Sequence, residues 1–178
     1  YAWNRLEEAV DWLHRLQRIA QDWRLMDLLV REELLAARLS LAKGDLSAAE
    51  LSLRQLEALI EQEWLVNHTS SMIAFRVQWW LAQGNLAEAT KWAAQTTLSP
   101  VAWNPLRKEE VLMLVRVFLA KQQYAKAIET LERFSQHLDR AGDIDTALEF
   151  LALYVVTLHQ IGKREQAIRV AARLLALT

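Results

Sequence analysis

The chain has 178 residues, 21 of them basic and 22 acidic, which gives a formal net charge of −1 at pH 7. It contains no cysteine, only four glycines and only two prolines. This composition excludes disulfides and zinc–thiolate sites, argues against a β-sandwich and offers no positive field to a phosphate backbone, and it fits a reducing cytoplasm.

Nine helices are predicted, because apolar residues recur at the i, i+3, i+4 and i+7 spacing of an amphipathic helix. The longest weakly charged stretch, residues 147–158, is too short to cross a bilayer. Nothing along the chain resembles a linker between independent domains. The predicted helices cover residues 4–20, 23–43, 45–62, 68–83, 85–96, 105–121, 124–140, 143–161 (or 145–161) and 163–177.

Several helix ends carry recognisable signals. Gly44 and Gly84 can adopt the left-handed conformation that closes a helix. Asp45 can cap the third helix, and Asn85 with Glu88 three residues later is a capping-box pattern for the fifth. These signals predict tight connections and therefore antiparallel neighbouring helices.

The remaining starts are less regular. Asn67 or Thr69 is expected to open the fourth helix, and residues 97–104 form the main predicted loop. After this loop, Asn104 is expected to cap the sixth helix with Pro105 at its first position, where a missing N–H costs nothing.

One short segment recurs along the chain at a spacing near forty residues. It reads LAKGDL, then LAQGNL, then LAKQQY, and each copy is followed by alanine three residues later. A fixed period in this range indicates a repeat array. The markers of the five copies, 40, 40, 38 and 40 residues apart, are Asn4, Gly44, Gly84, Gln122 and Gly162.

The recurring alanines have a geometric reason, because small side chains let two helix axes approach closely. They are predicted to sit at helix crossings, beside the larger side chains of Leu46, Leu86 and Tyr124. The expected fold is an all-α right-handed superhelix (an α-solenoid) of about four and a half helix pairs, forming one domain over residues 1–178. Because Tyr1 falls inside a helical pattern, an internal fragment of a longer protein is expected. The alanines are Ala9, Ala49, Ala89, Ala127 and Ala167.

No motif for catalysis or metal binding is found. The four histidines lack metal-ligand spacing, and no nucleophile elbow occurs. Adjacent acidic pairs point about 100° apart on a helix, so we interpret them as solvated faces or helix-start charges. The eight tryptophans are interpreted as core or inter-helix filler, not as an aromatic cage. The acidic pairs are Glu7–Glu8, Glu32–Glu33 and Glu109–Glu110.

A binding surface is predicted on the first helix of each pair, which lines the concave face of repeat solenoids. Equivalent positions give polar rows, with one apolar row (Leu34, Ala74, Leu112 and Ala152) as their floor. Arginine suits recognition of carboxylate or phosphate, although these side chains could instead pair with neighbouring acids or face water. The candidate ligand- or partner-binding residues are Arg31, Arg38, Arg76, Gln78, Glu109, Arg116 and Glu149.

The repeat pattern is a glycine, a leucine or tyrosine two residues later and an alanine five residues later. This spacing resembles a tetratricopeptide repeat (TPR), although the period of this chain is longer than the usual 34 residues. A closer resemblance is to the TPR-like (MalT-type) helical-repeat region of large ATP-dependent LuxR-family transcription regulators. It is carried by residues 111–120, 127–131, 140–143, 149–158 and 167–177. The resemblance extends over essentially the whole chain and is most specific from 103 to 177. Gln122 departs from it by replacing a glycine.

The resemblance implies a parent protein with an N-terminal NTPase module, this repeat region and a C-terminal helix-turn-helix domain. ATP and DNA would be bound by those other modules, since this segment has no phosphate-binding loop and no basic recognition helix. The segment itself is expected to be non-catalytic and cytoplasmic, and to hold neither a cofactor nor a metal. It is expected to contact neither nucleic acid nor membrane. Its expected role is to sense a small inducer or a protein partner, and self-association is possible. The alternative is a generic TPR scaffold that binds a peptide or protein.

Overall fold

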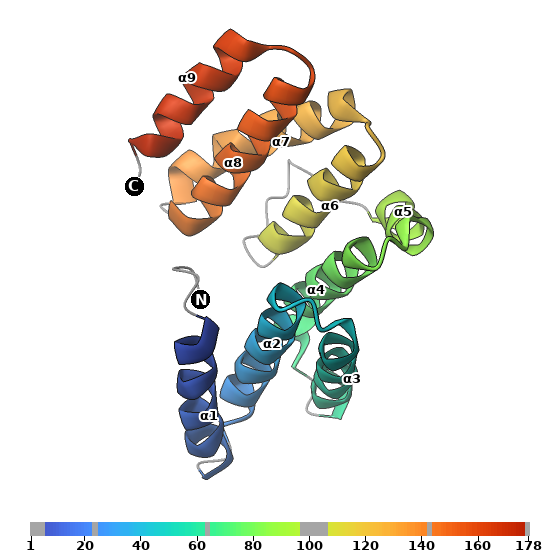
Figure 1. The fold of residues 1–178 in the computed structure, drawn as a ribbon, viewed down its shortest axis with the longest axis vertical. Helices are drawn as coiled ribbons and strands as arrows, with labels where there is room; N and C mark the ends of the chain where they lie inside the picture. The colour runs from blue at the N-terminus through green and yellow to red at the C-terminus, as the bar shows by residue number, and fades with distance from the viewer. Residues whose placement is uncertain (1–5, 23–24, 63–64, 97–106, 142–143, 177–178) are drawn as a thin grey trace. The chain divides into compact units, whose positions relative to one another are not determined.

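The computed structural model describes residues 6–22, 25–62, 65–96, 107–141 and 144–176. Within these residues the chain forms nine α-helices, one short 3-10 helix and no strand, which confirms the all-α prediction (Figure 1). The helices are α1 (Leu6–Asp22), α2 (Met26–Ala42), α3 (Leu46–Gln62), η1 (Val66–His68), α4 (Thr69–Ala82), α5 (Leu86–Gln95), α6 (Lys108–Ala120), α7 (Tyr124–Ala141), α8 (Ile144–Gln160) and α9 (Arg164–Leu175).

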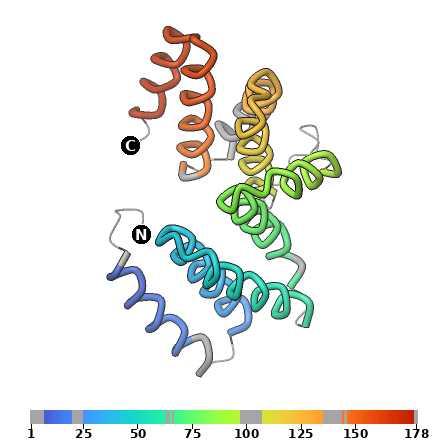
Figure 2. The backbone as a smooth tube through the Cα atoms, turned by 45° about the vertical axis from the view of Figure 1, so that its right-hand side comes forward, coloured from blue at the N-terminus to red at the C-terminus, as the bar shows by residue number. Residues whose placement is uncertain are grey.

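The chain divides into two compact units, residues 1–85 and 86–178. In the first unit, α1 packs on α2, α2 on α3 and α3 on α4, and α2 also contacts α4. In the second unit each helix from α5 to α9 packs on the next, and α6 also contacts α8 (Figure 2). Each unit therefore stacks TPR-like helix pairs in sequence order, as predicted. A right-handed superhelix and a single domain over the whole chain stay predictions.

Each unit has its own apolar core. The core of the first unit joins α2, α3 and α4, and its largest fully buried side chains are Leu56 and Phe75. In the second unit, α6 is buried over most of its length and packs with Leu131, Phe150 and Leu158 as the largest fully buried partners from α7 and α8. A helix that is apolar on nearly every face must be covered on several sides, which is why α6 contacts three other helices.

The recurring alanines are buried as predicted. Ala49, Ala89 and Ala127 are 0% exposed and Ala167 is 6% exposed. Ala9 is only half-buried, because α2 is the main neighbour of α1. The small side chain therefore marks a close helix contact in every full copy of the repeat.

The turn within each recurring segment has one geometry, the Schellman cap, in which the chain closes a helix through a left-handed residue. That residue has φ of +78° at Gly44, +73° at Gly84, +77° at Gly162 and +56° at Gln122. The N–H of the following residue donates to the carbonyl five residues before it, in the pairs Asp45–Ser40 (2.9 Å), Asn85–Trp80 (2.8 Å), Gln123–Phe118 (2.8 Å) and Lys163–Leu158 (3.0 Å). The predicted cap at Asp45 is also confirmed, since its Oδ1 accepts from the Ala48 N–H at 2.9 Å.

Gln122 keeps this geometry without being glycine. A Cβ added at Gly44, Gly84 or Gly162 would meet no heavy atom within 4 Å, so the backbone conformation alone favours glycine there. The side chain of Gln122 is exposed. The copy at residues 119–124 therefore tolerates glutamine at the cost of a strained left-handed φ.

We expect Gln122→Gly to raise the free energy of unfolding by about 0.5–1 kcal/mol, because relief of left-handed strain exceeds the added entropy of an unfolded glycine. Lys121→Gly is the matched control: Lys121 has φ −89°, so glycine relieves nothing there. That variant should be no more stable than the parent chain. Urea unfolding of both variants checks this, and a Gln122→Gly chain that is less stable contradicts it.

The fourth and sixth helices begin at residues that can be compared with the predicted caps. The fourth helix is capped by neither Asn67 nor Thr69: its N-cap is His68, which makes no side-chain cap hydrogen bond and ends the short helix η1. The sixth helix begins at Lys108, after Arg107 at the N-cap. Asn104, Pro105 and the predicted loop at 97–104 lie outside the described residues.

The tryptophans are less buried than predicted. Trp12 is 66% exposed, with the Arg15 guanidinium 4.8 Å from its ring centroid. Trp79, Trp80 and Trp92 are half-buried, and Trp79 Nε1 donates to the carbonyl of Leu46 at 3.2 Å. The filler interpretation is therefore wrong for Trp12, whose helix has too few neighbours to cover it. Outside the described residues lie Trp3, Trp23, Trp64 and Trp103.

Candidate functional site

The predicted binding residues lie on the first helices of successive pairs. Arg31 and Arg38 are on α2, Arg76 and Gln78 on α4, Glu109 and Arg116 on α6, and Glu149 on α8. Since α2 contacts α4 in the first unit and α6 contacts α8 in the second, equivalent positions within a unit can lie side by side.

In the second unit the structure brings two of these residues together. Arg116 Nη2 lies 3.9 Å from Glu149 Oε2, with the two side chains 37% and 57% exposed. Arg116 Nε is buried and has no hydrogen-bond partner among the described residues. A buried guanidinium N–H is normally satisfied, so this one leaves a donor available for an anionic or carbonyl oxygen.

In the first unit two of the predicted arginines already have acidic partners. Arg31 Nε donates to Asp27 Oδ2 at 2.9 Å, and both side chains are exposed. A hydrogen bond from His68 is the largest cause that lowers the pKa of Asp27. Arg76 donates from Nε and Nη2 to Glu57 Oε1 at 3.0 and 2.7 Å. Pairing with neighbouring acids therefore accounts for Arg31 and Arg76 without a ligand.

The rest of the predicted surface is half-buried or interior. Arg38, Gln78 and Glu109 are half-buried. Of the apolar row, three members belong to the core and Ala152 is exposed, so this row is not the floor of an open channel. The interior members are Leu34, Ala74 and Leu112.

Two members of the adjacent acidic pairs are buried. Glu110 lies in the first turn of α6 and is a helix-start charge, as predicted, whereas Glu32 lies in the interior of α2 and is not on a solvated face. Glu32 and Glu110 are each 4% exposed. Glu110 is compensated, because Arg107 Nε and Nη2 donate to its two carboxylate oxygens at 3.0 and 2.7 Å. Glu32 has no hydrogen-bond or ion-pair partner within the described part of the chain. Burial of such a group without a partner is costly, which makes Glu32 a candidate functional residue.

A signal for this burial was present in the sequence. The positions three and four residues before and after Glu32 are all apolar, and they are its neighbours on the helix surface. An acid in the middle of an apolar helix face indicates burial, not a solvated face. These neighbours are Leu28, Leu29, Leu35 and Ala36.

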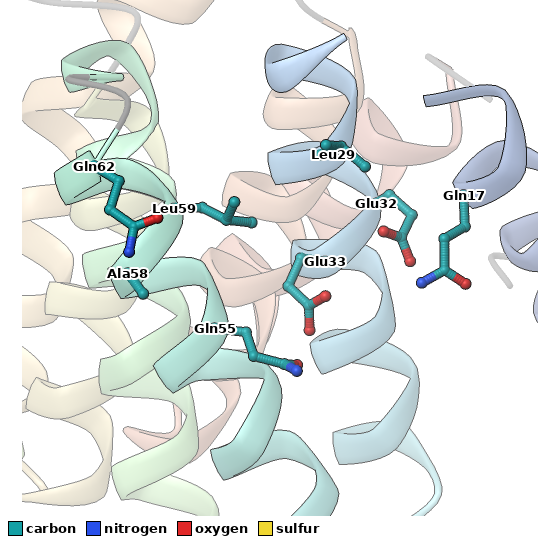
Figure 3. A pocket seen from close by; sticks show the side chains of 8 residues that line it. All are labelled: Gln17, Leu29, Glu32, Glu33, Gln55, Ala58, Leu59 and Gln62. Carbon is teal, nitrogen blue, oxygen red and sulfur yellow. The ribbon is translucent and has the colours of Figure 1, made fainter. Parts of the chain in front are cut away.

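Glu32 lines a cavity of about 390 Å³ in the first unit. In Figure 3 its carboxyl group points toward Gln17, and Glu33 points toward Gln55. The cavity has one polar side chain from α1, two carboxyl groups from α2, and two further amides from α3, with three apolar side chains between them. Its lining residues are Gln17, Leu29, Glu32, Glu33, Gln55, Ala58, Leu59 and Gln62.

The cavity perturbs both of its carboxyl groups. Burial raises the pKa of Glu32 to about 7, and the charge of Glu33 adds to the increase. Burial also raises the pKa of Glu33, while a hydrogen bond with Ser52 opposes the increase. A carboxyl group with a raised pKa in a cavity is a candidate for a binding or functional site.

Three further observations concern metal binding, a second cavity and membrane spans. Among the described residues, no group of three His, Cys, Asp or Glu side chains could hold a metal ion. A second cavity, of about 210 Å³, lies between α6 and α7; its lining includes Phe118, Lys126 and Arg133. Neither cavity is lined by any of the seven predicted residues. No helix in the described ranges is long and apolar enough to cross a membrane.

Comparisons with known proteins agree with the repeat architecture. The sequence model of the MalT-like TPR region matches residues 1–178. The HTH-type transcriptional regulator MalT of Serratia proteamaculans (strain 568) is 25% identical over 182 residues, covering 99% of this chain. The chain spans only 20% of the length of that relative.

Among solved structures, nearly identical TPR-like repeats of a Podosopora anserina kinesin light chain have a similar fold. Their Q17M form superposes with a TM-score of 0.57 at 19% identity, covering 97% of this chain and 94% of the other. A second crystal structure of those repeats has a TM-score of 0.55 with the same identity and coverage. At this identity the similarity concerns the fold alone.

Proposed function

The chain belongs to the MalT-like TPR region family, and from this premise we propose that it is the non-catalytic ligand- or partner-sensing segment of a MalT-type transcriptional regulator of the LuxR family. The proposal places the protein in the cytoplasm, with DNA binding assigned to another part of a longer chain. The similarity to a regulator of which this chain spans a fifth supports that division of labour.

The observation that carries the sensing role is the state of Arg116. Its Nε is a buried donor without a partner among the described residues, and its terminal nitrogen is 3.9 Å from Glu149. Arginine recognises planar oxygen pairs such as carboxylate and phosphate. The Arg116 side chain is partly exposed, so a ligand or partner oxygen would first meet its terminal nitrogens, and it would satisfy the Nε donor only where it reaches this buried atom.

Such binding can act as a signal only if it favours one conformation of the parent protein over another. The contacts between α2 and α4 and between α6 and α8 offer a physical route, because a ligand that bridges two first helices stabilises one spacing between them. We propose that this spacing is coupled to the activity of the rest of the regulator.

The test is the double substitution Arg38→Ala and Arg116→Ala in the parent regulator. We expect the melting temperature to change little, because both side chains are half-buried and the Arg116–Glu149 pair is long. The inducer concentration for half-maximal transcription should rise by about tenfold, because the variant loses a charge-assisted hydrogen bond to the inducer.

Arg54→Ala with Arg133→Ala is the matched control. Each of these arginines pairs with a glutamate one helical turn earlier on an exposed surface, with one arginine in each unit. The control should leave the dose–response curve unchanged. An unaltered curve for the Arg38/Arg116 variant would remove these residues from the site.

The alternative is a scaffold that binds a peptide or protein on the first helices. The two cavities described above are lined by none of the predicted residues, so neither of them is the site of this proposal. A thermal-shift screen against metabolites, sugars and nucleotides separates the two functions. A ligand that raises the melting temperature of this chain, but not that of the Arg116→Ala variant, supports the proposal that the surface binds a small inducer. The absence of any such ligand supports the scaffold.

A further inference from the structure

The cavity between α1, α2 and α3 is acidic and has no cation of its own. Two glutamates and three glutamines line it, and none of its lining residues is basic. Glu32 is 4% exposed and has no hydrogen-bond or ion-pair partner within the described ranges. The cavity therefore presents hydrogen-bond acceptors to whatever occupies it, and the protein does not neutralise their charge.

The chemistry of these acceptors selects the occupant. An ionised carboxylate accepts hydrogen bonds and, when buried, needs a positive partner. An ammonium group supplies three donors and a positive charge at one point. Gln17, Gln55 and Gln62 add carbonyl acceptors, while Leu29 and Leu59 offer apolar surface to a hydrocarbon stem. The volume of about 390 Å³ is in the range of small-molecule sites.

We propose that this cavity binds a small organic cation that carries a primary ammonium group, with the ammonium on Glu32 and Glu33. The hydrocarbon part of the ligand contacts Leu29, Ala58 and Leu59. A metal ion fits less well, because among the described residues no group of three metal-binding side chains occurs. A neutral alcohol also fits less well, because it leaves the carboxylate charge uncompensated.

The site is separate from the surface proposed above. It lies in the first unit and includes none of the seven predicted residues. Direct binding to the 178-residue chain tests it, whatever the response of a parent regulator. The failure of one proposal therefore does not imply the failure of the other.

The pH dependence follows from the groups that face Glu32. Glu33 is the only other titratable side chain in the lining; α1 and α3 contribute uncharged side chains, and α4, which also packs on α2, contributes none. Burial raises the pKa of Glu32 to about 7, so an ammonium ligand must displace a proton below that pH. Affinity should therefore rise between about pH 6 and about pH 8.

The experiment is isothermal titration calorimetry of the 178-residue chain with 1,4-diaminobutane at about 0.15 M salt, which screens exposed charges. The comparison ligands are n-butylamine, 1-butanol and magnesium chloride. The variants are Glu32→Gln, which keeps the shape and removes the charge, and Glu61→Gln. Glu61 is exposed on α3, directly before the lining residue Gln62 in sequence, and does not line the cavity, so it controls for general electrostatics.

We expect both amines to bind and neither 1-butanol nor magnesium to bind. In the Glu32→Gln variant the affinity for the amines should fall by at least about tenfold. Glu61→Gln should bind as the parent chain does. Circular dichroism shows whether Glu32→Gln is folded, and Glu33→Gln provides a second variant if it is not. Equal affinity in the parent chain and the charge-removing variants overturns the proposal. So does binding of 1-butanol or magnesium at the amine affinity, or no amine binding at about 10 mM.

Discussion

Ala127→Leu is expected to lower the free energy of unfolding by about 1–3 kcal/mol, because it overpacks a helix contact that has no spare volume. Ala127 is 0% exposed near the start of α7, a helix that packs on α6 and on α8. The added side chain must move a helix or adopt a strained rotamer. Ala89→Leu should have a similar effect, since Ala89 is also 0% exposed.

Ala125→Leu is the matched control, because Ala125 is exposed two residues earlier on the same helix. It makes the same chemical change with no neighbour to displace, so its effect should stay within about 0.5 kcal/mol. Urea unfolding monitored by circular dichroism measures all three variants. Equal stabilities for Ala127→Leu and Ala125→Leu would contradict the assignment of the recurring alanine to the helix contact.

Glu32→Gln is expected to raise the free energy of unfolding by about 2–3 kcal/mol at about pH 8. Burial raises the pKa of Glu32 from 4.5 to about 7 in the folded chain. At this pH the native protein therefore holds an ionised carboxylate that would be better solvated in the unfolded chain. Glutamine keeps the volume and removes that cost.

The sign of the pH dependence follows from the same pKa. The unfolded chain loses this proton near pH 4.5 and the folded chain only near pH 7, so between these values the folded state binds more protons. The contribution of Glu32 to stability is complete below pH 4.5 and is lost as the pH rises through about 7. Glu32→Gln should lack this slope, and Glu61→Gln should retain it. The same slope in all three proteins would contradict the raised pKa.

The two proposed sites differ in the charge of their side chains. The predicted surface on the first helices carries arginines, one of which has an unsatisfied buried donor, whereas the cavity of the first unit carries uncompensated carboxyl groups. The first suits an anionic group and the second a cationic one. The two sites share no residue, although α2 contributes to both, so their effects on a parent regulator can be separated by substitutions specific to each site.

The Schellman turns show how far local information reaches. Gly44, Gly84 and Gly162 predicted left-handed caps, and Gln122 adopts the same conformation because the hydrogen bonds of the turn span only five residues. The alanine of each copy was likewise predictable from its fixed distance to the turn. These features depend on contacts within one or two helical turns, which the residue order alone specifies.

Partners distant in sequence were not predictable in the same way. Arg76 pairs with Glu57, 19 positions earlier, and Arg116 lies near Glu149, 33 positions later. The sequence pattern placed three of these residues on candidate surfaces. It did not show whether the partner of each arginine is a ligand or a neighbouring acidic side chain. That choice depends on which helices pack together.

The sequence by itself determined the all-helical repeat, its glycine turns, the cap at Asp45 and the buried alanines, since each depends on neighbours a few residues away. The apolar neighbours of Glu32 indicated burial, but only the tertiary structure decided that Glu32 is covered and that Trp12 is exposed. The periodic pattern gives both residues a place on a helix, but burial depends on whether another helix covers that place. Glu32 lies on α2, which has neighbours on several sides, whereas Trp12 lies on α1, whose main neighbour is α2.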